Sequence, residues 1–252
     1  MKSTERFSDR VANYIRYRPH YPEAIIPYLQ KQTGLAGNWH IADVGSGTGI
    51  SSQLFLSAGY KVCGIEPNKE MREAAEQLLI AEANFTSVAA TAENTTLYDN
   101  SIDLIVAGQA FHWFERDKAK EEFKRILKPG GWLVLIWNER GIGSPFQRDY
   151  EAALTSYCPQ YAEVNHRNID PESISRFYQP FSCSKSVFDN RQQHSLHEVK
   201  GRLLSSSYAP LEGHPAHQPL IKELERIFDK YNTNGYVTFD YNCTVYAGQL
   251  KQ

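Results

Sequence analysis

The chain has 252 residues with an ordinary balance of hydrophobic and charged side chains, and its formal net charge is −2. This length suffices for one large domain, or for a domain with an inserted cap. The charge excludes a broad basic surface of the kind that binds a nucleic-acid backbone. No stretch is long and apolar enough to span a membrane, and the first residues lack a signal-peptide core. We therefore predict a cytoplasmic monomer or homodimer that binds neither nucleic acids nor membranes.

The cysteines and histidines give no sign of a metal site. The four cysteines are far apart in the sequence, without paired spacing, which predicts free thiols in a reducing compartment. Histidines in the second half of the chain match no recognised ligand spacing either. We predict no bound metal. The cysteines are Cys63, Cys158, Cys183 and Cys243.

The first segment, residues 1–35, is polar and rich in tyrosine, and we predict a helical lid there. Helices are expected over 9–17 and 22–32, the second with proline near its first turn. Residues 36–140 then alternate strand and helix signals. Near-continuous apolar strands joined by helices predict a parallel sheet that is covered on both faces. Strands are expected over 40–44, 60–65, 85–89, 102–107 and 132–137, with helices over 51–58, 68–81 and 117–127.

After residue 140 the alternation ends. Residues 141–235 contain helical patches, such as 149–157 and 219–231, and a short strand signal over 187–194, which predicts an inserted, mostly helical cap. Residues 236–252 begin with a long alternating strand. We expect this strand to close the sheet as an antiparallel edge. The predicted class is therefore α/β: a doubly wound, mostly parallel sheet with an antiparallel edge strand and an inserted cap.

A glycine-rich turn joins the first strand to its helix: Asp43-Val44-Gly45-Ser46-Gly47-Thr48-Gly49. Alternating glycines let the backbone turn sharply and approach a ligand closely, and the helix start favours an anionic or electron-rich group. The dinucleotide-binding pattern G-x-G-x-x-G fits less well, because its third glycine position falls on Ile50. An ordinary glycine-rich turn is the plainer alternative.

Two carboxylates follow the next strands. Glu66, at the end of the second strand, can accept hydrogen bonds from two ribose hydroxyls. Glu93, after the third strand, can accept from the exocyclic amine of adenine, while the backbone beside it donates to a ring nitrogen. Either residue alone is equally compatible with a solvated surface acid. Together they favour a ribose-bearing cofactor without choosing between a dinucleotide and another adenosyl compound.

An aromatic loop, Gly108-Gln109-Ala110-Phe111-His112-Trp113-Phe114, follows the fourth strand. Ligands of open parallel sheets bind beyond the carboxyl ends of the strands, where the strand order reverses. We therefore predict that this loop lines a binding site. A hydrophobic plug beneath the cap is the alternative.

These motifs, followed by Leu127-Lys128-Pro129-Gly130-Gly131, resemble those of the class I S-adenosylmethionine-dependent methyltransferases in order and spacing. The likeness covers residues from about 38 to 138. It is strongest to the small-molecule subgroup called methyltransferase type 11, which includes trans-aconitate methyltransferase-like proteins. The resemblance implies a Rossmann-like fold and S-adenosylmethionine as cofactor. The Asn/Asp-Pro-Pro-aromatic motif of base and amide N-methyltransferases does not follow the fourth strand, which argues against nucleobase or glutamine methylation.

The resemblance also implies roles for individual residues around the methionyl part of the cofactor. Gly45, Ser46 and Gly47 would lie against it, and Asp43 would orient its amino group. Gln109 would lie near the sulfonium. We further expect the first segment to fold over the cofactor, with Tyr14 and Arg18 contacting its carboxylate.

At the other end of the cofactor, the resemblance implies that Glu66 holds the ribose hydroxyls. Pro67 and Met71 would lie against the adenine face. Glu93 and the backbone of Ala92 would bind the adenine edge.

Methyl transfer from a sulfonium needs mainly alignment and exclusion of water, and aromatic faces attract the positive sulfur. Phe111 and Trp113 are the predicted wall of the substrate pocket, to which Tyr208 is added from the cap. His112 is the predicted base because its ordinary pKa is near neutrality, although a simple hydrogen-bonding role is an alternative.

The predicted function is methyl transfer to an oxygen, carbon or carboxyl nucleophile of a small molecule. Two alternatives stay open at this point: a nucleotide-dependent oxidoreductase, and a non-catalytic binding protein of the same fold.

Overall fold

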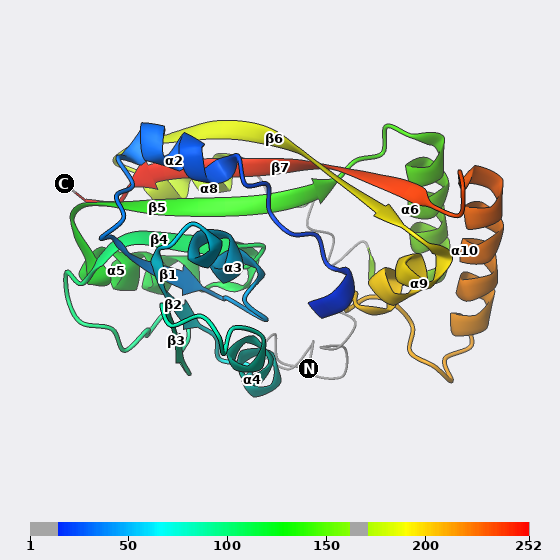
Figure 1. The fold of residues 1–252 in the computed structure, drawn as a ribbon, viewed down its shortest axis with the longest axis horizontal. Coiled ribbons are helices and arrows are strands. Elements are labelled where there is room, and N and C mark those ends of the chain that lie inside the picture. Colours follow the sequence, from blue (N-terminus) through cyan, green and yellow to red (C-terminus); the bar gives the residue numbers. More distant parts are fainter. Residues whose placement is uncertain (1–14, 162–170, 252) are drawn as a thin grey trace.

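The structure is a computed structural model that describes residues 15–161 and 171–251 (Figure 1). Tyr14 and most of the first predicted helix lie outside these residues. Seven of the described strands form one sheet in the order β3-β2-β1-β4-β5-β7-β6. They are β1 (His40–Val44), β2 (Lys61–Ile65), β3 (Phe85–Val88), β4 (Ile102–Gly108), β5 (Leu127–Arg140), β6 (Cys183–His194) and β7 (Val237–Gln249).

The first five strands are parallel, and the chain starts in the middle of the sheet and winds outward in both directions. This confirms the predicted doubly wound, mostly parallel sheet. We expected the last strand at the edge of the sheet, and this prediction was wrong. β7 pairs antiparallel with β5 on one side and with β6 on the other. The edge strand is β6, which pairs with β7 along its whole length, from Cys183 to His194.

Several of the helices begin where the sequence supplies a side-chain cap. Asn68 accepts a hydrogen bond from the Met71 amide, and Ser195 forms a capping box with Glu198. The helices are α2 (Ile25–Thr33), α3 (Ile50–Ser57), α4 (Lys69–Leu78), α5 (Arg116–Ile126), α6 (Pro145–Tyr157), α8 (Pro171–Tyr178), α9 (Leu196–Leu204) and α10 (His217–Tyr231).

Alternate side chains of the central strands enter two separate cores. In β4, Leu104 and Val106 pack with α2 and α3, whereas Ile105 and Ala107 pack with α5 and α8. α8 and β6 thus belong to the layers of the central sheet, although both fall inside the segment predicted as the cap.

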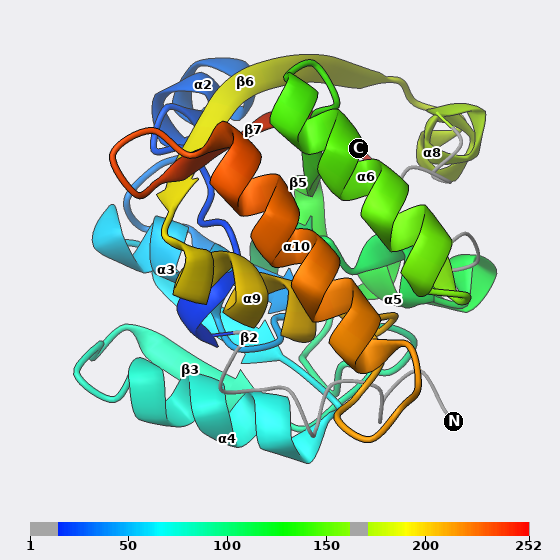
Figure 2. The ribbon, with the colours of Figure 1, turned by 90° about the vertical axis from the view of Figure 1, so that its right-hand side faces the viewer.

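The cap proper consists of α6, α9 and α10 at one end of the long strands β5, β6 and β7 (Figure 1). Figure 2 shows α6 and α10 side by side in front of α9. These helices have their own core, which includes Tyr150 and Leu224 and extends onto Phe239 of β7. The strands therefore connect the cap rigidly to the sheet.

Residues 15–24 cross between the cap and the core (Figure 1). The Tyr17 hydroxyl hydrogen-bonds to His197 Nε2 at 2.9 Å. The Tyr17 ring lies so close to α9 that a Cβ on Gly201 would be 2.0 Å from it, so glycine is required there. Arg18 Nη2 donates to the Ser205 carbonyl at 3.3 Å, just after α9 ends. We call residues 15–24 the strap.

All four cysteines are free. In residues 15–161 and 171–251, no helix is long and apolar enough to cross a membrane. Nor does any group of three His, Cys, Asp or Glu side chains in these ranges have an arrangement that could hold a metal ion.

Candidate functional site

A cavity of about 450 Å³ lies at the carboxyl ends of β1 and β4, where the strand order reverses, and extends to the cap. Most of the predicted site residues line it: Arg18, Gly45, Ser46, Gly47, Glu66, Pro67, Met71, Ala92, Glu93, Gln109, His112, Trp113 and Tyr208. Asp43 and Phe111 do not line it. The motifs that the sequence singled out therefore converge on one cavity.

The glycine turn forms one wall of the cavity with backbone atoms. Gly45, Gly47 and Gly49 have φ angles of 70°, 56° and 87°, in the left-handed region that favours glycine. A Cβ on Gly45 would lie 2.5 Å from the Cβ of Ala110. The turn and the aromatic loop can therefore be this close only because Gly45 has no side chain.

Asp43 lies buried beneath the glycine turn. Its Oδ2 accepts hydrogen bonds from the hydroxyls of Ser51 and Ser52, at 2.7 and 2.6 Å. Its Oδ1 is buried without a hydrogen-bond partner in the described part of the chain. Burial raises the pKa of Asp43 to about 6. An unsatisfied buried acceptor below the turn fits the predicted ammonium of the cofactor, although Asp43 is one layer below the cavity surface.

Glu66 lies at the end of β2 with its carboxylate fixed by two backbone amides. Gly47 N–H donates to Oε2 at 2.9 Å, and Asn68 N–H donates to Oε1 at 2.8 Å. Burial raises the pKa of Glu66, which these two hydrogen bonds partly offset. A carboxylate has about four acceptor positions, so two remain for a pair of hydroxyls. This geometry fits the predicted ribose contact.

The loop after β3 supplies the predicted adenine-binding residues. Ala92 and Glu93 both line the cavity. Glu93 Oε1 accepts a hydrogen bond from the Glu115 amide at 2.8 Å. The carboxylate therefore joins this loop to the end of the aromatic loop, a role that the sequence did not indicate.

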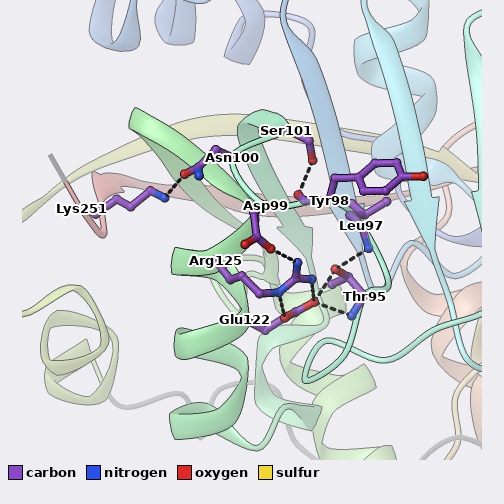
Figure 3. A network of polar contacts seen from close by, with 9 residues as sticks. All are labelled: Thr95, Leu97, Tyr98, Asp99, Asn100, Ser101, Glu122, Arg125 and Lys251. Atoms are coloured by element: carbon purple, nitrogen blue, oxygen red, sulfur yellow. Dashed lines mark hydrogen bonds and ion pairs between the residues drawn. The ribbon is translucent and has the colours of Figure 1, made fainter.

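A polar network around the buried Thr95 and Glu122 fixes the same loop (Figure 3). Glu122 of α5 accepts hydrogen bonds from the amide and the hydroxyl of Thr95, at 2.7 and 2.6 Å. Arg125 donates to both carboxylate oxygens of Glu122 and also to Asp99. The hydrogen bonds from Arg125 are the main cause that lowers the pKa of Glu122 to about 2. The network fixes Thr95, which lies in the same loop as Glu93 and two residues after it.

Gln109 begins the aromatic loop in a strained backbone conformation, with φ at 56°. Its Nε2 donates to the Asn138 carbonyl at 3.1 Å. Its Oε1 is buried and has no partner in residues 15–161 and 171–251. Gln109 lines the cavity, so a second buried acceptor without a partner lies near the cavity wall, at the residue that we expect beside the sulfonium.

The aromatic loop divides its rings between the cavity and the core. Phe111–Trp113 form a short 3-10 helix, which turns Phe111 inward. Its ring packs on Phe177 at a centroid distance of 4.8 Å and is 1% exposed. Phe111 is therefore a core residue, and our prediction of it as pocket wall was wrong. Trp113 lines the cavity as predicted, and Phe114 lines it as well.

His112 lines the cavity next to Trp113, with ring centroids 4.5 Å apart. The ring is open to solvent through the cavity, but the surrounding protein atoms remove much of its hydration. This desolvation lowers the pKa of His112 to about 4. His112 is therefore neutral at pH 7 and accepts protons more weakly than an ordinary histidine.

The cap end of the cavity is lined by residues that the sequence analysis missed: Asn138, Arg140, Arg202 and Tyr241. The first two lie at the carboxyl end of β5, a position that could have identified them. Arg202 lies three residues after Val199 and next to Leu203, and both of these residues are buried. An arginine on the apolar side of α9 could therefore have pointed to a functional residue there.

Comparisons with known proteins agree with this geometry. Residues 42–135 match the sequence model of a family described as "Methyltransferase domain". The chain is 35% identical over 134 residues to an uncharacterized methyltransferase of Mycobacterium tuberculosis, covering 53% of this chain and 52% of that protein. The chain thus spans about half the length of the mycobacterial relatives that it matches.

Two solved structures share the fold. One, a candidate type II methyltransferase from Anaeromyxobacter dehalogenans, has a TM-score of 0.66 and 20% identity, covering 93% of this chain and 99% of that one. The other is phosphoethanolamine N-methyltransferase 2 of Haemonchus contortus in complex with S-adenosyl-L-methionine, with a TM-score of 0.59 and 17% identity, covering 100% of this chain and 61% of that one. Such distant likenesses confirm the Rossmann-like fold and name no acceptor for this chain.

Proposed function

We propose that this chain is a class I methyltransferase that uses S-adenosylmethionine as its cofactor and methylates a small molecule held between the sheet and the cap; the match of residues 42–135 to a methyltransferase domain supports the proposal. One observation carries the proposal: a single cavity extends from Glu66, at the predicted ribose position, to Tyr241, on the cap side. A donor and an acceptor can therefore lie in contact there. When bound, S-adenosylmethionine supplies a methyl group already activated on a sulfonium.

The residues of the core end would bind and orient the cofactor. Glu66 accepts from the ribose hydroxyls, and Glu93 with the Ala92 backbone binds the adenine edge. The backbone at Gly45 and Gly47 lies against the methionyl part, above the buried carboxylate of Asp43. Two acceptors are buried without partners, Asp43 Oδ1 and Gln109 Oε1. In this assignment Asp43 Oδ1 faces the positive ammonium and Gln109 Oε1 faces the positive sulfonium.

The strap completes the enclosure of the cavity. Arg18 lines it and also donates to Ser206 Oγ at 3.3 Å. We place the cofactor carboxylate near Arg18, so the same side chain would contact cofactor and cap. An Arg18→Ala variant should bind S-adenosylhomocysteine more weakly than wild type in calorimetric titration. Equal affinity would exclude this contact.

At the acceptor end, His112 would receive a proton from an oxygen or carbon nucleophile, or hydrogen-bond to a nucleophile that has none. Its neutral state at pH 7 suits either role, but a pKa of about 4 makes it a weak base. His112→Ala should retain affinity for S-adenosylhomocysteine and lose turnover. In wild type, the acid limb of the pH–rate profile that belongs to His112 should lie near pH 4 and not near pH 6.5. Unchanged turnover in His112→Ala would exclude both roles.

Binding and turnover experiments separate this function from its alternatives. Calorimetric titration with S-adenosylmethionine, S-adenosylhomocysteine and NAD should show heat with the first two ligands only. Binding of NAD instead would favour the oxidoreductase. Release of S-adenosylhomocysteine in a screen of small acids and phenols would establish catalysis. Tight binding without turnover across that screen would favour a non-catalytic binding protein.

A further inference from the structure

The charged side chains that line the cavity are sorted by sign. The acids, Glu66, Glu93 and Glu115, belong to the core end, which we assign to the cofactor. The cations belong to the strap, the end of β5 and α9. They are Arg18, Arg140 and Arg202. Positive charge is therefore concentrated at the end where the acceptor would bind.

Two of these arginines are paired with a carboxylate or with the end of a helix dipole. Arg140 forms an ion pair with Glu151 and donates to the Tyr161 hydroxyl at 2.9 Å. Arg18 donates to the carbonyl of Ser205, at the negative end of the α9 dipole. Arg140 is thus paired with a carboxylate, and Arg18 with the carboxyl-terminal dipole of a helix.

Arg202 differs from both. It is 5% exposed, and its Nε donates to the Tyr241 hydroxyl at 2.7 Å. Its guanidinium carbon lies 4.7 Å from the centre of the Phe239 ring and 5.4 Å from that of Tyr241. No carboxylate of residues 15–161 or 171–251 forms an ion pair with it. Glu198, on the same helix, binds Ser195 instead, in the capping box.

This arrangement is unfavourable in the free protein. A guanidinium stays protonated in proteins, so Arg202 cannot lose its charge on burial. Aromatic faces and a phenol oxygen offset only part of the lost hydration. Among the described residues, Tyr241 is the one that accepts a hydrogen bond from the Arg202 side chain, through Nε, and Arg202 lines the cavity. A bound anion would supply both the missing charge and the missing acceptors.

We propose that the methyl acceptor is a small molecule with a carboxylate, and that Arg202 binds this carboxylate. The proposal rests on the function proposed above and specifies its substrate class. A carboxylate fits better than a phosphate monoester, because one uncompensated guanidinium balances one negative charge and its planar fork matches two coplanar oxygens. Tyr241 accepts from Arg202 Nε, so its own hydroxyl hydrogen can donate to the same anion.

The test measures thermal unfolding midpoints with anions and their neutral analogues. The probes are sodium propionate and sodium benzoate, with propionamide, benzamide and sodium phosphate for comparison, at constant ionic strength. The proteins are wild type, Arg202→Met and Arg202→Lys, with Arg191→Met as the control. Arg191 is a surface arginine of β6 whose side chain is 73% exposed.

We expect at least one carboxylate to raise the midpoint of wild type and of Arg191→Met by several degrees, and to have little effect on Arg202→Met. Arg202→Lys should lie between them, and the amides should have no effect. Without ligand, Arg202→Met should unfold no earlier than wild type, because it removes an uncompensated buried charge.

The proposal fails if no carboxylate raises the wild-type midpoint more than that of Arg202→Met. It also fails if phosphate gives the larger Arg202-dependent shift. Titration with S-adenosylhomocysteine, expected to be equal in all four proteins, tests the cofactor independently. If it does not bind to wild type, the proposed function fails while an Arg202-dependent carboxylate effect would still establish the anion site.

Discussion

The two ends of the cavity are built in different ways. At the core end, the side chains come from the carboxyl ends of β1, β2 and β3 and from the aromatic loop, all within one stretch of sequence. At the cap end, Arg18, Arg140, Arg202 and Tyr241 come from four segments that only the tertiary structure brings together. The first end can therefore be recognised from local spacing, and the second cannot.

The ends also differ in what they lack. The core end has buried acceptors without donors, at Asp43 Oδ1 and Gln109 Oε1. The cap end has Arg202, a buried donor group without an acid. A pair of ligands that is positive toward the core and negative toward the cap would satisfy both ends at once.

Gly45→Ala should disrupt the core end most. The new Cβ would meet Ala110 at 2.5 Å in a backbone conformation with φ at 70°, which must displace the turn or the aromatic loop. Because a displacement of about 1 Å can cost roughly 100-fold in rate, we expect turnover to fall at least that far. Calorimetry should also show much weaker binding of S-adenosylhomocysteine.

Gly59→Ala is the matched control for this change. Gly59 has a similar φ of 85°, but its added Cβ would meet nothing within 4 Å. It therefore reproduces the backbone strain without the collision. Equal losses in both variants would mean that strain, and not the contact between the turn and the aromatic loop, explains the effect.

Glu66→Gln removes the charge from the predicted ribose site while keeping its size. Hydrogen bonds to a charged group contribute about 1.5–3 kcal/mol, which corresponds to roughly 10- to 150-fold in affinity for S-adenosylhomocysteine. Titration of the variant should give a dissociation constant raised by that factor. Glu73→Gln, on the exposed side of α4, should match wild type. An unchanged dissociation constant in Glu66→Gln would show that Glu66 does not bind the ribose.

The contrast between the ends explains what the sequence could predict. Strands such as β4 carry apolar runs whose alternate residues face the two cores, so the pattern gives both the strand and its two-sided burial. Phe111 and Trp113 look equivalent in sequence, but a single 3-10 turn sends one to the core and the other to the cavity. Such a turn has no hydrophobic period from which it could be read.

The position of β7 was equally out of reach. Its alternating pattern predicts a strand, but both an edge strand and an inner strand at the end of a sheet satisfy that pattern. β6 decides between them, and its residues alternate only in degree of exposure, with few apolar side chains. Arg202 could have been singled out as an arginine on the apolar side of α9, but its role depends on the absence of an ion-paired carboxylate among the described residues, which is a property of the tertiary structure.

Asp43 allows the core end to be tested by pH. Its pKa is about 6 in the folded protein and 3.8 in the unfolded chain, so the folded state binds the proton more tightly. The stability contributed by this proton is complete below pH 3.8 and is lost as the pH rises through 6, at about 1.4 kcal/mol for each pH unit. Asp43→Asn, which does not titrate, should gain stability relative to wild type between pH 4.5 and 7.5.

The same carboxylate should make cofactor affinity depend on pH. An ammonium group nearby favours the charged form, so affinity for S-adenosylhomocysteine should fall below pH 6 by up to about tenfold for each unit. In Asp43→Asn the affinity should be lower at pH 7.5 and flat between pH 5 and 7. If the affinity of wild type for S-adenosylhomocysteine is also independent of pH, Asp43 does not contact the amino group of the cofactor.

Glu122→Gln acts on the core end only through the loop that carries Glu93, so its effect on binding should be smaller than that of Glu66→Gln. The glutamine keeps an acceptor for Thr95 and gives up the charge that pairs with Arg125 (Figure 3). We expect a loss of about 1.5–3 kcal/mol in the free energy of unfolding, measured in urea. Glu121→Gln, one residue earlier on the exposed side of α5, is the control. If adenosine affinity fell as far in Glu122→Gln as in Glu66→Gln, the network would be part of the binding site itself, and the division between a binding layer and a supporting layer would be wrong.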